Sequence, residues 1–228
     1  LLGIYHISIL IILSDNGGVI LLKENYQKHF MKQKMIRTVI VSLIPIVISS
    51  IYFFGWRSLL LLMVVTIAGL ATEWIFEKKY NRKVSEAVFV SCLLYTMTLP
   101  PATPFWIAAI GIIFGIFFSK EVFGGFWKNI FNPALVARAF VYVCFPTPLT
   151  IQWSKSATGF PGGFATYLTE GIDAISQATP MLIFRETGNL ASMKDLILGN
   201  VAGSLGETSA ILIILAGIYL IYKKVASW

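Results

Sequence analysis

The chain has 228 residues, of which 57% are hydrophobic and only 13% charged, and its mean hydropathy is +0.77. A soluble domain carries about 25% charged residues, so this composition excludes an ordinary soluble enzyme and indicates an integral membrane protein. The formal charge of +7 is accordingly expected to mark one membrane face rather than a nucleic-acid-binding surface.

The first 34 residues form a segment of their own, marginally apolar and then basic. Its apolar run, residues 7–13, is too short to cross a hydrocarbon core, which takes roughly 20 residues of helix. The segment also lacks the basic flank and the small-residue cleavage site of a signal peptide. We expect residues 1–34 to lie in the cytosol or at the membrane interface.

Six apolar runs follow, and each one predicts a transmembrane helix. They cover residues 35–55, 58–76, 86–99, 104–119, 132–146 and 208–222. Pro45 lies inside the first run and is expected to kink that helix. The third and fifth runs are short for a simple crossing, and short or broken spans often pack inside a bundle next to a site.

Lysine and arginine residues divide unequally between the two sets of loops. Thirteen of them lie before or at the start of the first run or follow the second, fourth and sixth runs, whereas four lie in the opposite loops. Cytoplasmic loops carry the excess of positive charge in membrane proteins. The N-terminus is therefore expected in the cytosol, and residues 147–200 on the extracytoplasmic side.

The predicted fold is an all-α integral membrane bundle of about six transmembrane helices, some of them short or broken, with one long extracytoplasmic loop. Residues 35–146 are expected to form a five-helix bundle, residues 147–200 the loop, and residues 201–228 the sixth helix. A multi-pass protein of this kind has the lipid bilayer as a partner and no nucleic acid.

The long loop contains a polar, hydroxyl-rich stretch, Asp-Ala-Ile-Ser-Gln-Ala-Thr-Pro, at residues 173–180. Thr179 followed by Pro180 is a common helix start, with threonine as the N-cap and proline as the first helical residue. A helix N-terminus presents N–H groups and a positive dipole that suit a phosphate group. Thr179 is thus expected to cap a helix, and it is a candidate anchor for a phosphate-bearing ligand. Ser176 and Ala178 are small enough to let such a ligand approach.

Two further polar stretches predict helix starts. Asn132 before a proline repeats the cap-plus-proline pattern at the fifth run, and Ser204 with Glu207 fits a capping box before the sixth. Gly124 and Gly125 lie in a turn between the fourth and fifth runs, where glycine permits a positive φ.

Two charged residues, Glu73 and Arg138, lie away from the first few residues of an apolar run. Glu73 is the only acid well inside the second run, and Arg138 lies in the fifth run, about 9 Å along a helix from its start. A charged side chain at the bilayer centre costs roughly 2.5–3.5 kcal/mol on insertion scales, so it is a functional candidate by default. Arg138 is expected to snorkel to the cytosolic headgroups, or to pair with Glu73.

These motifs resemble the membrane flavin subunits of respiratory ion pumps: NqrB of the sodium-translocating NADH:quinone reductase and RnfD of the Rnf complex. The resemblance runs from about residue 30 to residue 228 and is carried by residues 120–125, 132–140, 173–180 and 203–209. It implies FMN bound covalently to Thr179, the last residue of a Ser-x-Ala-Thr motif, through a phosphoester. Gln177 makes this motif more similar to that of the Rnf protein, whereas residues 132–140 are more similar to the sodium-pump protein. The sequence therefore leaves both assignments, Rnf and sodium pump, open.

The resemblance also implies roles for other residues. Glu73 matches a membrane carboxylate implicated in cation uptake, and Asn132 matches an asparagine near a riboflavin, which makes riboflavin a second candidate cofactor. Electrons would pass from the flavin on Thr179 towards a second flavin near Asn132 and Arg138. The remaining candidate flavin-binding residues are Asp173, Ser176, Ala178, Glu207, Gly124 and Gly125.

The implied function is that of a subunit of an ion-translocating electron-transport complex in a bacterial inner membrane, coupled to Na⁺ or H⁺ movement. Its expected partners are the other subunits, including an extracytoplasmic FMN subunit, with quinone as a further candidate. Members of the family continue past the end of this chain with a second set of helices.

A different class of function stays open from the residues alone. Broken helices that flank a midplane site, with Glu73 or Arg138 as the ion-binding residue, are typical of a solute or ion transporter or channel without flavin. No dinucleotide-binding fingerprint is visible, and the two histidines have no ligand-like spacing, so neither an NADH site nor a metal site is expected.

Overall fold

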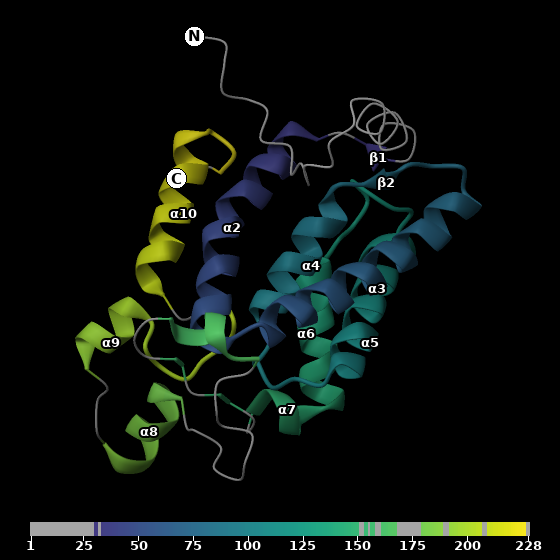
Figure 1. Ribbon diagram of the computed structural model, residues 1–228. Helices are drawn as coiled ribbons and strands as arrows, with labels where there is room; N and C mark the ends of the chain where they lie inside the picture. Colours follow the sequence, from purple (N-terminus) through teal and green to yellow (C-terminus); the bar gives the residue numbers. More distant parts are fainter. Residues whose placement is uncertain are drawn as a thin grey trace.

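The computed structural model describes residues 30–31, 33–150, 153–154, 156–157, 161–167, 179–188, 192–206 and 209–226. The predicted site residues Asp173, Ser176, Ala178 and Glu207 lie outside this part of the chain, as does the apolar run near the N-terminus. The described residues are mostly helical, as an all-α membrane protein requires. Figure 1 shows the longer helices side by side in a bundle, with short helices gathered at one of its ends.

The apolar runs form helices close to the predicted bounds. Helix α2 covers Lys34–Phe54, with Pro45 inside it, and α3 covers Arg57–Lys79; both are long and apolar enough to cross a membrane. The shorter ones are α4 (Ala87–Met97), α5 (Phe105–Ile116), α6 (Pro133–Cys144) and α10 (Ala210–Tyr222). The 11 residues of α4 reach only about 17 Å, little more than half of a ~30 Å hydrocarbon core.

The core forms where α5 packs against α3 and α6, and where α4 packs against α3. Small residues set the distance between α5 and α6. A Cβ atom at Gly115 would lie 2.5 Å from the carbonyl oxygen of Pro133 and 2.6 Å from Cβ of Ala137, so only glycine permits this approach. The outer faces stay apolar: Ile48 is 53% and Ile67 68% exposed, as expected of side chains that contact lipid.

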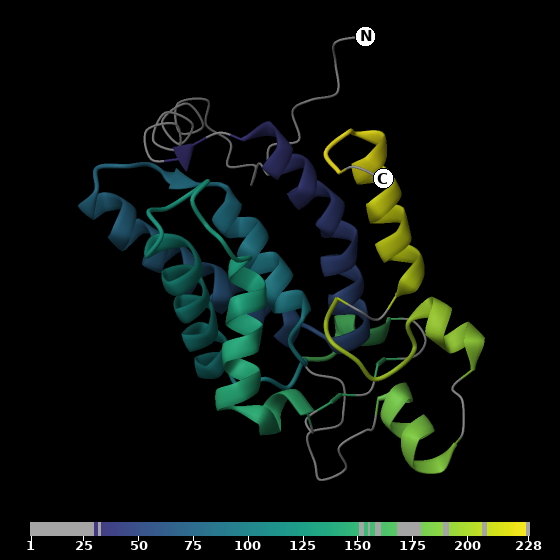
Figure 2. The same cartoon turned by 180° about the vertical axis from the view of Figure 1, so that it is seen from behind.

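One end of the bundle carries a short strand pair that the all-α prediction missed. Strand β1 (Phe30–Met31) pairs in parallel with β2 (Val84–Ser85). Next to it, Arg37 at the start of α2 forms an ion pair with the buried Glu86 before α4. Figures 1 and 2 show this strand pair at the same end as the start of α2, the end of α3 and the end of α10.

The predicted extracytoplasmic loop holds several short helices at the opposite end. They are α7 (Pro146–Thr150), the 3₁₀ turn η2 (Gly162–Ala165), α8 (Pro180–Thr187) and α9 (Met193–Leu198). The segment is tied to the α2–α3 connection, because the N–H groups of Trp56 and Arg57 donate to the carbonyl oxygens of Thr166 and Tyr167. Residues 147–200 thus contribute helical structure as well as loop to this end.

The predicted capping box before the last helix is wrong. Helix α10 begins at Ala210, with Ser209 before it, so Ser204 does not cap it. Ser204 is instead buried, and the next two residues pair their backbone with the end of α4: Leu205 N–H donates to Leu99 O, and Gly206 N–H to Met97 O. Backbone hydrogen bonds to a distant part of the chain thus replace a helix start at this point.

Candidate functional site

Thr179 is the residue that immediately precedes α8. The backbone N–H of Ile183 donates to the carbonyl oxygen of Thr179 at 3.0 Å, so Thr179 occupies the N-cap position that its pairing with Pro180 predicts. Its side chain is half-buried. The threonine lies at the positive end of the helix dipole, where the first-turn N–H groups of α8 favour a negative charge.

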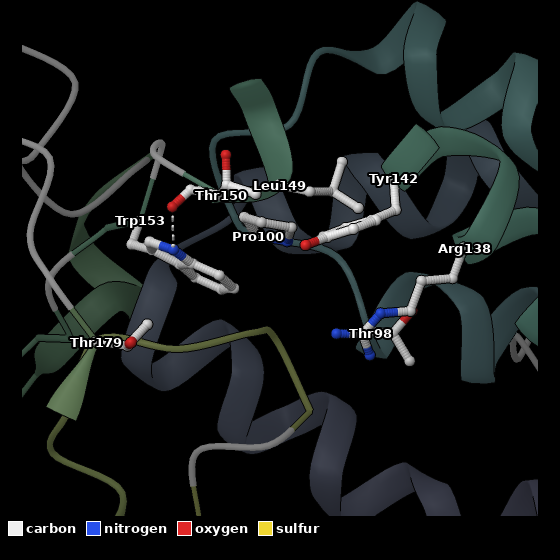
Figure 3. Close-up of a pocket in the computed structure, with 8 residues that line it drawn as sticks. All are labelled: Thr98, Pro100, Arg138, Tyr142, Leu149, Thr150, Trp153 and Thr179. Carbon is white, nitrogen blue, oxygen red and sulfur yellow. Dashed lines mark hydrogen bonds between the residues drawn. The ribbon is translucent and has the colours of Figure 1, made fainter. Parts of the chain in front are cut away.

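A cavity of about 270 Å³ opens beside Thr179 (Figure 3). Its lining residues are Thr98, Pro100, Arg138, Tyr142, Leu149, Thr150, Trp153 and Thr179. They come from the end of α4, from α6, from α7 and the segment after it, and from the start of α8. The lining combines hydroxyl groups, two aromatic rings and one guanidinium group, a mixture of apolar surface and a few polar groups that is typical of cofactor sites.

Arg138 lines this cavity, which is not the place that the sequence suggested. It projects from α6 on the face that also carries Tyr142, because residues four apart in a helix share a face. The predicted Arg138–Glu73 pair is wrong, because Glu73 pairs with Lys120. The π-helix η1 (Phe117–Glu121), which continues α5 and packs against α3, brings Lys120 to that carboxylate.

Trp153 and Tyr142 are cavity residues that the sequence analysis did not single out. Nε1 of Trp153 donates to the carbonyl oxygen of Thr150 at 3.1 Å, which satisfies the only polar group of the indole and holds it against α7. In Figure 3 the indole lies on the same side of the cavity as Thr179, and Arg138 lies on the far side. In the sequence, Trp153 and Tyr142 stand out only as aromatic residues near a predicted membrane boundary. Aromatic residues at such positions are equally typical of interface anchors.

A second polar cluster lies at the opposite end of the bundle. Glu73 is fully buried; its Oε2 lies 2.5 Å from Nζ of Lys120, and its Oε1 accepts the backbone N–H of Ser85 at 2.7 Å. Nζ of Lys120 also donates to Oγ of Ser85 at 2.8 Å. Both buried charges therefore have an oppositely charged partner and further hydrogen bonds, which is the condition for burying them.

Two more carboxylates, Glu77 and Glu121, are buried within electrostatic range of this pair. Glu121 and Lys120 are neighbours in η1, and π-helical segments frequently occur at functional sites. Among the described residues, Oε2 of Glu77 and Oε1 of Glu121 accept no hydrogen bond. We call Glu73, Glu77, Lys120 and Glu121 the buried ionic cluster.

Gly124 and Gly125 contact this cluster and do not line the cavity beside Thr179. Their φ angles are +100° and +89°, so the predicted need for glycine at positive φ is confirmed. A Cβ atom at Gly125 would lie 2.6 Å from Oε1 of Glu77. Nη1 of Arg82 donates to the carbonyl oxygen of Gly124 at 2.5 Å, which closes the turn over the buried carboxylates.

Asn132 is the N-cap of α6, as predicted. Its side-chain oxygen accepts the backbone N–H of Ala134 at 3.0 Å, and Pro133 is the first helical residue. The structure therefore separates Asn132, at the N-terminal end of α6, from the cavity that Arg138 lines further along the same helix. A flavin-binding role for Asn132 stays a prediction, as do the roles of Asp173, Ser176, Ala178 and Glu207.

Comparison with known proteins gives a consistent set of relatives. The chain is 36% identical over 208 residues to the D subunit of the proton-translocating ferredoxin:NAD(+) oxidoreductase complex of Clostridium ljungdahlii, covering 86% of this chain and 59% of that protein. It is 35% identical over 185 residues to the B subunit of the Na(+)-translocating NADH-quinone reductase of Klebsiella pneumoniae, covering 76% of this chain and 43% of that protein. It is 32% identical over 201 residues to the D subunit of the Na(+)-translocating ferredoxin:NAD(+) oxidoreductase complex of Acetobacterium woodii, covering 85% of this chain and 59% of that protein.

The alignments with these relatives span 43% to 59% of the relatives' own length. The model of the NQR2, RnfD, RnfE family matches residues 25–228, which is nearly the whole chain. The resemblance that the motifs suggested is thereby confirmed. This chain belongs to the NQR2, RnfD, RnfE family.

Proposed function

We propose that the chain is a membrane subunit of an ion-translocating oxidoreductase of the Rnf or Na⁺-NQR type and that Thr179 carries FMN through a phosphoester bond. The observation that carries the proposal is the position of Thr179, at the N-cap of α8 and on the wall of a cavity. Its relatives are subunits of such complexes by name, which supports the same assembly for this chain.

The residues around Thr179 fit this cofactor. A phosphate esterified to the threonine hydroxyl would meet the first-turn N–H groups of α8, a recurrent setting for phosphate in proteins. The cavity offers aromatic rings at Tyr142 and Trp153 and a guanidinium group at Arg138, which suit a flat ring system with polar edges. When bound, the flavin supplies electron transfer, and the protein supplies its anchoring and its electrostatic surroundings.

The buried ionic cluster is the part of the chain that we assign to ion movement. It holds three buried carboxylates against the buried ammonium group of Lys120, with the guanidinium group of Arg82 at its edge. Three ionised carboxylates against these two cations leave an excess of negative charge. Such an excess favours uptake of a cation or of a proton. This charge balance supports the proposal that Glu73 and its neighbours take part in coupling to Na⁺ or H⁺.

The charges also support an orientation in a bacterial inner membrane. Lys34 begins α2, Lys79 ends α3 and Lys223 follows α10, and Figure 1 shows these helix ends on the side of the strand pair and the buried ionic cluster. Arg57 at the start of α3, Arg185 in α8 and Lys194 in α9 belong to the opposite end, with the cavity. By the positive-inside rule the cluster end faces the cytosol, so the N-terminal side of α2 is cytoplasmic and Thr179 is extracytoplasmic. The proposed partners are the other subunits of the complex, including an extracytoplasmic FMN subunit.

The covalent bond is testable on a denaturing gel under ultraviolet light, with the chain produced beside its maturation enzyme and partner subunits. We expect a fluorescent band that Thr179→Val abolishes and that Thr150→Val, which removes another hydroxyl from the same cavity, retains. Mass spectrometry of the peptide around Thr179 should show the added flavin phosphate. An unmodified peptide would refute the proposal, and a band that survives Thr179→Val would place the bond on another residue.

A further inference from the structure

The geometry points to Arg138 and Trp153 as the residues that hold and tune the flavin on Thr179: the indole packs against its ring system, and the guanidinium group faces its polar edge. This inference rests on the proposed function, because it assumes a flavin at Thr179. It adds two positioning residues that Thr179 and its motif do not identify.

The first support is the composition of the cavity wall. Among the eight described residues that line the cavity, Arg138 is the only charged one, and it shares this space with Thr179 although the two lie far apart in the chain. Its side chain is half-buried and belongs to an otherwise apolar helix. A half-buried guanidinium group is screened less by solvent than an exposed one, so its charge acts on whatever occupies the cavity.

The second support is the way in which Trp153 is held. Its Nε1–H donates to the carbonyl oxygen of Thr150, at the end of α7, so the indole has no unmet polar group. Its remaining surface is an aromatic face, and aromatic faces stack on flat conjugated rings. Figure 3 shows the indole on the same side of the cavity as Thr179 and the guanidinium group on the other side, so a ligand anchored at Thr179 has the aromatic ring and the charge as two walls of its site.

Two measurable consequences follow. Reduction adds negative charge to the polar edge of a flavin, and a nearby cation stabilises that charge, so Arg138 should raise the midpoint potential of the bound flavin. A tryptophan in contact with a flavin quenches the flavin's fluorescence. Trp153 should therefore keep the fluorescence of the bound flavin low in the native protein. A purely structural role of either residue would change neither quantity while the flavin stays in place.

The experiment uses the complex with all its subunits, and mass spectrometry first establishes that the Thr179 peptide carries flavin in every variant. A redox titration then gives the midpoint potential, with Thr179→Val subtracted to remove the signal of other flavins. We expect Arg138→Leu to lower the potential and Arg138→Lys, which keeps the charge, to stay near the wild type. Lys194→Leu removes a cation from the same end outside the cavity and should have no effect.

The second arm measures flavin fluorescence of the native complex. Trp153→Phe should raise it severalfold, whereas Trp106→Phe, which changes an exposed indole outside the cavity, should leave it unchanged. If the peptide carries flavin but Arg138→Leu leaves the potential unchanged and Trp153→Phe leaves the fluorescence unchanged, this inference is overturned while the proposed function stands. If the peptide carries no flavin in the wild type, the proposed function itself fails.

Discussion

Lys120 and Glu73 form an ion pair inside the bundle: the ammonium nitrogen lies 2.5 Å from the carboxylate oxygen, and both side chains are at least 95% buried. The pair joins η1 to α3, and both residues also bond to Ser85 in β2. Three segments that are separate in the chain thus meet at two opposite charges, and the remaining carboxylates of the buried ionic cluster lie around them.

Breaking this pair should destabilise the protein strongly. Glu73→Gln or Lys120→Met leaves one buried charge without its partner, which costs about 3–5 kcal/mol of the free energy of unfolding. The double variant removes both charges and should recover much of that loss. Thermal unfolding in detergent measures the effect, with Glu186→Gln on the exposed face of α8 as the control. A double variant less stable than both single ones would show that the pair is not the main interaction.

Gly125 should tolerate alanine less well than Gly188. Both have a positive φ, +89° and +71°, so alanine costs about 1–2 kcal/mol of backbone strain at either position. At Gly125 the new Cβ would also lie 2.6 Å from Oε1 of Glu77, whereas at Gly188 it meets nothing within 4 Å. Unfolding of the two variants under the same conditions gives the difference directly. Equal losses would mean that the contact between Gly125 and Glu77 relaxes at no cost.

Asn132→Ala should lower the free energy of unfolding by about 1 kcal/mol, because the N–H of Ala134 loses its side-chain acceptor at the start of α6. Asn132→Ser keeps an acceptor and should stay close to the wild type. Covalent flavin fluorescence on a denaturing gel should be the same in both variants, because Asn132 does not line the cavity beside Thr179. Loss of the fluorescent band in Asn132→Ala alone would show that the cap end of α6 reaches the flavin.

The orientation predicts which surface residues an impermeant thiol reagent reaches. In a Cys144→Ser background, where Cys92 is buried, Lys194→Cys should react with a charged maleimide added to spheroplasts. Lys79→Cys, at the other end of the bundle, should react only after the membrane is permeabilised. Both replaced lysines are exposed, so access to the reagent is limited by the membrane rather than by folding. The opposite pattern would place Thr179 in the cytosol.

Local sequence patterns predicted the parts of the fold that depend on neighbours in the chain. The apolar runs located the longer helices to within a few residues, because a run of lipid-compatible side chains can satisfy its backbone only as a helix. Cap-plus-proline pairs located the starts of α6 and α8, because a helix cap depends only on residues that are neighbours in the chain. The capping box at Ser204 failed because the backbone of Leu205 and Gly206 bonds to residues far away in the chain, which no local pattern reveals.

The sequence by itself determined that this is an apolar, mostly helical chain with Thr179 at a helix start, since composition, hydropathy and capping act over a few residues. Only the tertiary structure decided which charges and rings meet: Glu73 with Lys120, and Arg138 with Trp153 and Thr179 around one cavity. The physical reason is that a charge inside a bundle takes the partner that packing brings within a few ångströms. That partner depends on how η1, α6 and α8 are placed in space rather than on spacing along the chain.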